Sequence, residues 1–346
     1  MLANHWSSRK HLVTIITMEA VDTKEYYDID PKIDLVRLSL PSKSTGKLTK
    51  STVVKRILAI RRSIKKIAPD VIFSFLTRTN ILTLFAVWGF DVPVIVSERN
   101  NPAVQPMSRF WQLSRRLLYP RAFGLVTMTQ GAMDFFPKAM RARSWIIPNA
   151  VKQRASQRDC QLKNAVTAVG RLTNQKGFDL LLEAFAQIAP DFREWKLVIW
   201  GEGDDRGQLE AQRDRLGLAG RVDMPGVTIE PGAWIESADI FVLSSRYEGW
   251  GNVLLEAMAS GLPVVSADCE WGPREMVTDG HDGLLFKAGD VAALARSLAR
   301  VIGDPHLRER LGHNAFLTAQ KYSPGRVMAD WDRLLETVFT RDATAV

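Results

Sequence analysis

Residues 248–256 read Glu248-Gly249-Trp250-Gly251-Asn252-Val253-Leu254-Leu255-Glu256 and follow, after two residues, the apolar strand-like run at 240–245 (IFVLSS). A β-branched run that ends in glycines and continues as a helical pattern predicts a strand, a tight turn and a helix. The first N–H groups of such a helix lack intrahelical partners and bind anions such as phosphate. We expect Glu248 in the turn and Glu256 about two helical turns further on, because eight residues are close to two turns of 3.6. An ordinary strand–turn–helix with a glutamate favoured by the helix dipole gives the same pattern.

A second motif supplies cations. The run at 165–169 is followed by Gly170-Arg171-Leu172-Thr173-Asn174-Gln175-Lys176-Gly177. Arg171 offers a planar fork of donors and Lys176 a point charge, which together suit a diphosphate, including one that leaves with developing negative charge. In open parallel sheets ligands bind at the carboxyl ends of the strands, where both motifs are expected.

Strand-like and helix-like runs alternate along nearly the whole chain of 346 residues, which is long enough for two domains. This alternation predicts an α/β protein with two doubly wound, Rossmann-like domains that face a cleft. We expect a first domain at 1–150, a linker at 151–163, a second domain at 164–324, and a C-terminal helix and tail at 325–346 that can pack back on the first domain. A helical pattern at 2–6 precedes the first strand-like run, so neither an opening strand nor its Gly-rich turn is expected in this chain.

Composition narrows the class of protein. Hydrophobic residues make up 46% of the chain, which excludes wholesale disorder, and two cysteines indicate neither a disulfide framework nor a zinc site. No apolar run is long enough to span a bilayer, and we expect a cytoplasmic protein. Residues 1–150 hold 23 Lys and Arg against 10 Asp and Glu, whereas the remainder is net acidic. A basic first half favours contact with an anionic surface; a merely soluble basic face is the alternative.

Taken together, the motifs resemble those of retaining glycosyltransferases of family 4, which have the GT-B fold. The matching stretches are 97–102 (SERNNP), 147–149 (IPN), 169–177, 201–203 (GEG), 245–249 (SRYEG), 256–265 (EAMASGLPVV), 271–275 (WGPRE) and 280–286 (GHDGLLF). They cover nearly the whole chain. The set is highly specific, although no single motif would suffice.

The resemblance implies transfer of a hexose from a UDP- or GDP-linked sugar, by front-face substitution with retention and without metal or other cofactor. Catalysis would rest on Arg171, Lys176 and Glu248, with Glu248 at the hexose and Glu256 at the ribose. The base would lie near Met224 and Val227. The residues implied in donor binding are Gly170, Arg171, Lys176, Met224, Val227, Glu248, Gly249, Trp250, Gly251, Asn252, Val253 and Glu256.

The acceptor side is less well defined. Glu98, Arg99 and Asn100 follow the strand-like run at 94–97 and are acceptor-side candidates, with a structural salt bridge as the alternative for Glu98-Arg99. Residues 109–119 (RFWQLSRRLLY) mix basic and apolar side chains at helical spacing, which suits a helix on an anionic membrane or one with a single buried face. Asp28-Ile29-Asp30 matches the acidic pair of metal-dependent glycosyltransferases only weakly, and a solvated loop is expected there.

We therefore expect a peripheral enzyme on the inner face of the cell membrane that elongates a glycan, with a lipid-linked acceptor, in surface polysaccharide or oligosaccharide assembly. The alternative is a non-catalytic nucleotide-sugar-binding remnant or partner subunit, suggested by the absent opening strand. A nucleotide-sugar epimerase fits the Glu248–Glu256 spacing less well. Nucleic-acid binding is not expected, because the basic residues come without a recognisable recognition module.

Overall fold

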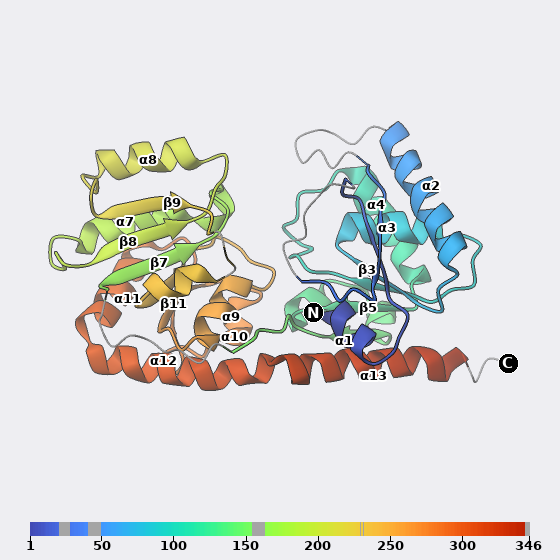
Figure 1. Cartoon of the computed structure of the whole chain (residues 1–346). Helices are drawn as coiled ribbons and strands as arrows, with labels where there is room; N and C mark the ends of the chain where they lie inside the picture. The colour runs from blue at the N-terminus through green and yellow to red at the C-terminus, as the bar shows by residue number, and fades with distance from the viewer. Residues whose placement is uncertain (21–27, 41–49, 154–162, 229, 231, 343–346) are drawn as a thin grey trace.

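A computed structural model describes residues 1–20, 28–40, 50–153, 163–228, 230 and 232–342. The chain forms two α/β lobes, and the C-terminal helices run beneath both of them (Figure 1). The predicted α/β class and the arrangement in two lobes are confirmed. Of the expected linker, residues 154–162 lie outside the described part of the chain.

The second lobe contains one parallel six-stranded sheet with the order β12-β11-β10-β7-β8-β9. This is the doubly wound order, in which the chain leaves β7 toward one edge of the sheet and later returns to β7's other side as β10. The strands are β7 (Ala165–Val169), β8 (Lys196–Trp200), β9 (Val222–Gly226), β10 (Ile240–Leu243), β11 (Val264–Asp268) and β12 (Leu284–Lys287). The helices are α7 (Phe178–Ile188), α8 (Arg206–Arg215), α9 (Asn252–Ala259), α10 (Pro273–Met276), α11 (Val291–Gly303) and α12 (Pro305–Ala319).

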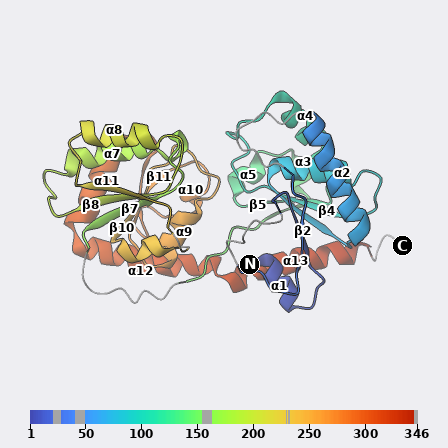
Figure 2. The same cartoon turned by 45° about the horizontal axis from the view of Figure 1, so that its top comes forward.

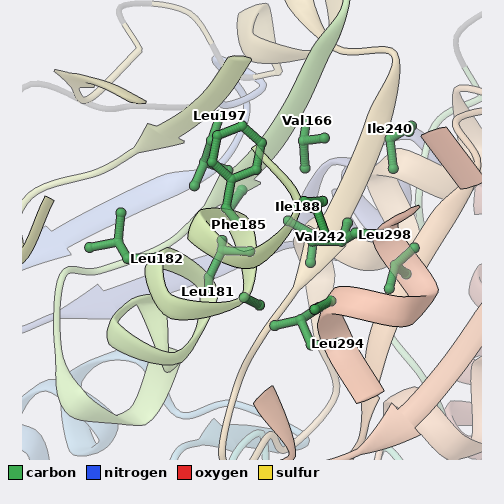
Figure 3. Close-up of a cluster of buried hydrophobic side chains, with 14 of the residues drawn as sticks. Val166, Leu181, Leu182, Phe185, Ile188, Leu197, Ile240, Val242, Leu294 and Leu298 are labelled. Atoms are coloured by element: carbon green, nitrogen blue, oxygen red, sulfur yellow. The ribbon is translucent and has the colours of Figure 1, made fainter. Parts of the chain in front are cut away.

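Apolar side chains fill both faces of this sheet. On one face α7 and α11 pack against the strands, with Leu181, Phe185 and Leu298 fully buried (Figure 3). On the other face α9 packs through Leu254 and Met258. Because both faces are covered, the strands read as continuous apolar runs, which is why the sequence predicts them well.

The first lobe holds two separate parallel sheets, β1-β2 and β3-β4-β5-β6. The strands are β1 (Thr14–Thr17), β2 (Asp34–Arg37), β3 (Ile72–Phe75), β4 (Val94–Ser97), β5 (Gly124–Thr127) and β6 (Ser144–Ile146). The helices are α1 (Leu2–Ser8), α2 (Lys50–Ile67), α3 (Thr77–Ala86), α4 (Arg109–Leu118), α5 (Gln130–Asp134) and α6 (Lys138–Arg141). Among the described residues no strand joins β1 to β3. The sheet is therefore divided where a doubly wound order would put its opening strand.

The last helix, α13 (Pro324–Asp342), belongs to the first lobe by packing although it follows the second lobe in sequence (Figures 1 and 2). Its Trp331, Leu334 and Val338 are buried in one cluster with Ile95 of β4 and Val126 of β5. Trp331 also packs edge-on against Trp6 of α1, with ring centroids 6.4 Å apart. The expected return of the C-terminal helix to the first domain is thus confirmed.

Candidate active site

The 170–177 and 248–256 motifs meet at the switch point of the six-stranded sheet. The 170–177 turn follows β7, and the 244–251 turn follows β10, its hydrogen-bonded neighbour. The amide of Gln175 donates to the carbonyl of Tyr247 at 3.1 Å, and the N–H of Arg246 donates to the carbonyl of Gln175 at 2.8 Å. These contacts hold the turns together as one wall.

Lys176 and Glu248 form an ion pair in this wall. The Lys176 Nζ to Glu248 Oε1 distance is 2.6 Å, and the side chains are 14% and 7% exposed. The hydroxyl of Ser245 donates to the same carboxylate oxygen at 2.7 Å. Ser245 is absent from the predicted site; its signal was its place directly before the Arg246-Tyr247-Glu248 motif. An ammonium group has three donors, so Lys176 can pair with Glu248 and still face an anion.

Two glycines, Gly170 and Gly177, allow close contacts between the turn after β7 and its neighbours. A side-chain carbon on Gly177 would lie 2.2 Å from the carbonyl oxygen of Ser244, and Gly177 has a φ of +63°. A carbon on Gly170 would lie 3.0 Å from Cε of Lys176, so the bare glycine leaves room for the lysine stem. The turn between β7 and α7 therefore needs glycine for close approach and for its left-handed conformation.

Helix α9 begins at Asn252, after Gly251 with a φ of +95°. The expectation that Glu256 lies about two helical turns beyond Glu248 is wrong: because the helix begins only at Asn252, Glu256 lies just over one turn into α9. Gly251 adopts a left-handed conformation, which ends the turn and delays the helix. The N–H groups of Leu254 and Leu255 donate to Gly251 O, whereas the first N–H groups of α9, at Asn252 and Val253, precede the helix's own acceptors and are the ones that an anion at this helix N-terminus would use.

Of the other predicted donor residues, Arg171 is exposed just beyond the end of β7, and its side chain forms no ion pair or hydrogen bond with another residue in the described part of the chain. Met224 lines an open recess of about 500 Å³ at β8 and β9, together with Trp200 and Pro225. Val227, beyond β9, is 65% exposed. The roles assigned to these residues stay predictions.

The first lobe reaches the same wall. Asn149 Nδ2 donates to Asn252 Oδ1 at 2.7 Å, and Asn101 Nδ2 donates to the carbonyl of Glu248 at 3.4 Å. A side-chain carbon on Gly249 would lie 2.8 Å from the Asn101 nitrogen. Loop 99–105 and the 249–252 turn therefore meet at the junction of the two lobes, where the interdomain cleft is expected. The exposed Asn100 lies at its edge.

Glu98 does not face this cleft, contrary to the expectation for an acceptor-side residue. It is 1% exposed, and its carboxylate accepts hydrogen bonds from the hydroxyls of Tyr119 and Thr77, the latter at 2.7 Å. Burial raises the pKa of Glu98 above its ordinary value, while the two hydroxyls act in the opposite direction. The strand end turns this side chain inward, toward α3 and α4. The alternative expectation, a salt bridge between Glu98 and Arg99, is also wrong, because the donors to the Glu98 carboxylate are the hydroxyl groups of Thr77 and Tyr119.

Arg99 points the other way, toward the C-terminal helix. Its guanidinium lies over the ring of Trp331, 5.2 Å from the centroid, and donates to Ile147 O at 3.0 Å and Asn149 Oδ1 at 3.2 Å. Burial lowers the pKa of Arg99 to about 10. Arg99 therefore connects α13 to Asn149, which in turn contacts α9 across the cleft.

The weak acidic match at 28–30 is a structural turn. Asp30 accepts from the hydroxyl of Ser7 at 3.0 Å and from the N–H of Lys32 at 2.9 Å, and the latter bond is the main reason that the pKa of Asp30 is lowered.

Across the described ranges no cluster of His, Cys, Asp and Glu has the geometry of a metal site. No helix in those ranges combines the length and the apolar character needed to cross a bilayer.

Family profiles match both lobes. Residues 1–150 match the profile described as "Glycosyl transferase 4-like domain", and residues 152–318 match "Glycosyl transferases group 1".

Among curated proteins, the chain is 28% identical over 334 residues to a GalNAc-alpha-(1->4)-GalNAc-alpha-(1->3)-diNAcBac-PP-undecaprenol alpha-1,4-N-acetyl-D-galactosaminyltransferase of Campylobacter jejuni. That match covers 95% of this chain and 91% of the relative. The lipopolysaccharide core biosynthesis glycosyltransferase LpsE of Rhizobium meliloti is 37% identical over 153 residues, 44% of each chain.

Solved structures of similar fold include sucrose-phosphate synthase from Thermosynechococcus elongatus, with a TM-score of 0.85 and 19% identity over 98% of this chain and 92% of that one. Anabaena Alr3699/HepE in complex with UDP-glucose has a TM-score of 0.74 and 21% identity over 89% of this chain and 86% of that one. The two profile matches, the full-length relative and the shared fold agree with the motif resemblance. The chain belongs to the group 1 glycosyltransferases with the GT-B fold.

Proposed function

We propose that the protein transfers a hexose with retention from a nucleoside diphosphate sugar to a lipid-linked glycan, without a metal ion. The observation on which this rests is the Lys176–Glu248 pair beside the N-terminus of α9. A lysine and a helix N-terminus neutralise a diphosphate, and a carboxylate one contact away can hold the sugar hydroxyls.

In this proposal Arg171 and Lys176 stabilise the leaving diphosphate, and backbone N–H groups from Trp250 to Val253 hold its oxygens. Glu248 orients the hexose and Glu256 the ribose. The bond from the anomeric carbon to the diphosphate oxygen breaks, and the acceptor oxygen attacks from that same face. The departing diphosphate takes the acceptor's proton, which balances the transfer.

The acceptor class comes from the relatives. The Campylobacter jejuni enzyme is named for an undecaprenyl diphosphate-linked substrate and LpsE for the lipopolysaccharide core. A lipid-linked glycan in surface polysaccharide assembly is accordingly the acceptor class that we propose. An acceptor of this class implies that the enzyme acts at the cytoplasmic face of the cell membrane. UDP-sugars are the first donors to test, because UDP-glucose occupies HepE.

The test is a screen of UDP- and GDP-sugars for release of the nucleoside diphosphate, with membrane extract as the source of acceptor. Acceptor-dependent release with one donor class, and an axial glycosidic product from an axial donor, would support the proposal. Retained activity in excess EDTA would support metal independence. Tight binding of UDP or GDP without turnover under any condition would favour the non-catalytic alternative.

A further inference from the structure

Helix α4 has large apolar residues on its solvent side as well as on its buried side. Phe110, Leu113 and Leu117 are 56%, 58% and 63% exposed, at positions i, i+3 and i+7 of one face. The opposite face is buried through Trp111 and Leu118. The buried residues fix α4 to the lobe; Phe110 adds an edge-on contact with Trp111 but keeps more than half of its surface exposed.

The apolar stripe is bordered by cations. Arg109 and Arg116 are exposed on the same side of α4, whereas Arg115 turns inward and lies over the ring of Phe135, 4.8 Å from its centroid. The sequence contains no acidic residue between Glu98 and Asp134. No acidic residue on α4 itself offsets these cations.

Helix α2 repeats the pattern. Val54 and Leu58 are 53% and 44% exposed, and Lys55, Arg62, Lys65 and Lys66 are exposed along the same helix. No acidic residue occurs between Asp34 and Asp70. Both α2 and α4 pack against α3, so the two helices belong to one layer of the first lobe (Figures 1 and 2).

We infer that this layer, with α4 as its main contact and α2 as its extension, docks the protein on an anionic lipid bilayer. Apolar side chains interleaved with long basic ones suit an interface where rings and branched chains enter below the headgroups and cations meet lipid phosphates. A nucleic-acid backbone would match the cations but leave Phe110, Leu113 and Leu117 in water. An acidic protein surface would need a complementary apolar groove.

The position of α4 would bring the membrane close to the site where the acceptor binds; this step rests on the proposed function. The loop that begins α4 starts at the end of β4 and passes the cleft, where the backbone of Asn100 and Asn101 lies against Gly249. A bilayer under α4 would therefore lie at the first-lobe side of the cleft. A lipid-linked acceptor, whose diphosphate stays at headgroup level, could enter without leaving the membrane.

The experiment is flotation of the full chain with vesicles of phosphatidylglycerol and phosphatidylethanolamine, compared with vesicles of phosphatidylcholine alone. The wild-type protein should float with the anionic vesicles and less so at high salt. R109E/R116E should bind at least about 25-fold more weakly, since each of the two basic residues near the surface contributes roughly a factor of five. F110S/L113S/L117S should also lose most of its binding, because its three apolar side chains no longer enter below the headgroups.

Matched controls are Arg296→Glu/Arg300→Glu on α11 and Leu317→Ser on α12, which change exposed residues of the second lobe and should float like wild type. UDP binding, followed by thermal shift, and turnover on a short-chain, water-soluble acceptor should be unchanged in the α4 variants. This separates loss of docking from failure of the proposed function, which would remove turnover in every variant. Equal flotation of wild type and both α4 variants would overturn the inference. So would equal binding to phosphatidylcholine, or a dimer in solution that the α4 variants dissociate.

Discussion

Lys176 and Glu248 show how a single ion pair links stability to chemistry. Both side chains are mostly buried, and a buried charge that loses its partner is costly. In the proposed mechanism this lysine is also the cation that receives the leaving diphosphate. The ion pair would then hold that charge in position before the substrate binds.

Lys176→Ala should lower kcat by roughly 10²–10³-fold, because a preorganised cation at the leaving group is lost. It should also reduce the free energy of unfolding by about 3 kcal/mol, since Glu248 remains buried with Ser245 as its donor. Steady-state kinetics and urea unfolding measure the two effects.

Adding Glu248→Gln to Lys176→Ala should recover much of the stability but none of the turnover. Lys196→Ala, an exposed change at the start of β8, is the control and should leave both quantities unchanged. Near-normal turnover in folded Lys176→Ala would contradict the role given to this lysine.

Glu98 makes stability depend on pH. Its native pKa is raised above 4.5 by burial, so its contribution is complete below about pH 4.5 and is lost as the pH rises through the native pKa. Glu98→Gln should therefore flatten the decline in unfolding free energy between about pH 4.5 and neutrality, while glutamine still accepts from Tyr119. Urea unfolding across that range checks it. Glu309→Gln, on the exposed side of α12, should leave the slope as it is, and an equal effect of the two changes would refute the assignment.

Among the elements, the turn between β7 and α7 places Lys176, and Gly177 is its critical residue. Gly177→Ala should cost about 3 kcal/mol or more and lower turnover, because it combines a left-handed φ with a contact of 2.2 Å to Ser244 O. Gly217 has a similar φ of +69°, but a side-chain carbon there would have no atom within 4 Å. Gly217→Ala should therefore lower the free energy of unfolding by about 1 kcal/mol, through the left-handed backbone conformation alone, and leave turnover intact. Thermal unfolding and steady-state kinetics of both variants test this. An equal loss of unfolding free energy in the two variants would contradict a role for the contact with Ser244 O.

The sequence predicts the elements of the second lobe well, because buried parallel strands such as β10 read as continuous apolar runs. It also places Lys176 and Glu248 at the same edge of one sheet, since both follow strands of the second domain, but the ion pair between them comes from the structure. It does not predict the side to which Glu98 turns. That depends on Tyr119, which lies 21 positions away, and only the packing of α4 brings the hydroxyl to the carboxylate. The sequence also does not predict that α9 begins only at Asn252, which follows from the positive φ of Gly251 directly before it.

At the scale of the molecule, α13 fastens the two lobes together. Trp331→Ala should lower the unfolding free energy of the first lobe by about 3–5 kcal/mol, because it empties a buried aromatic cluster and removes the ring under Arg99. Phe339→Ala, on the exposed side of the same helix, should cost much less. Urea unfolding followed by circular dichroism measures both, with UDP binding as the readout of the second lobe. Identical midpoints for the two variants would argue against this role of α13.

The same helix has a consequence for how the polypeptide is made. The strands of the first lobe leave the ribosome early, but the side chains that complete their core, at 327–338, are synthesised after the entire second lobe. During that interval Ile95, Val126 and their neighbours have no cover, and a nascent chain in this state depends on chaperones or on rapid elongation to avoid aggregation. Slow codons placed between the lobes should therefore lower the yield of native protein.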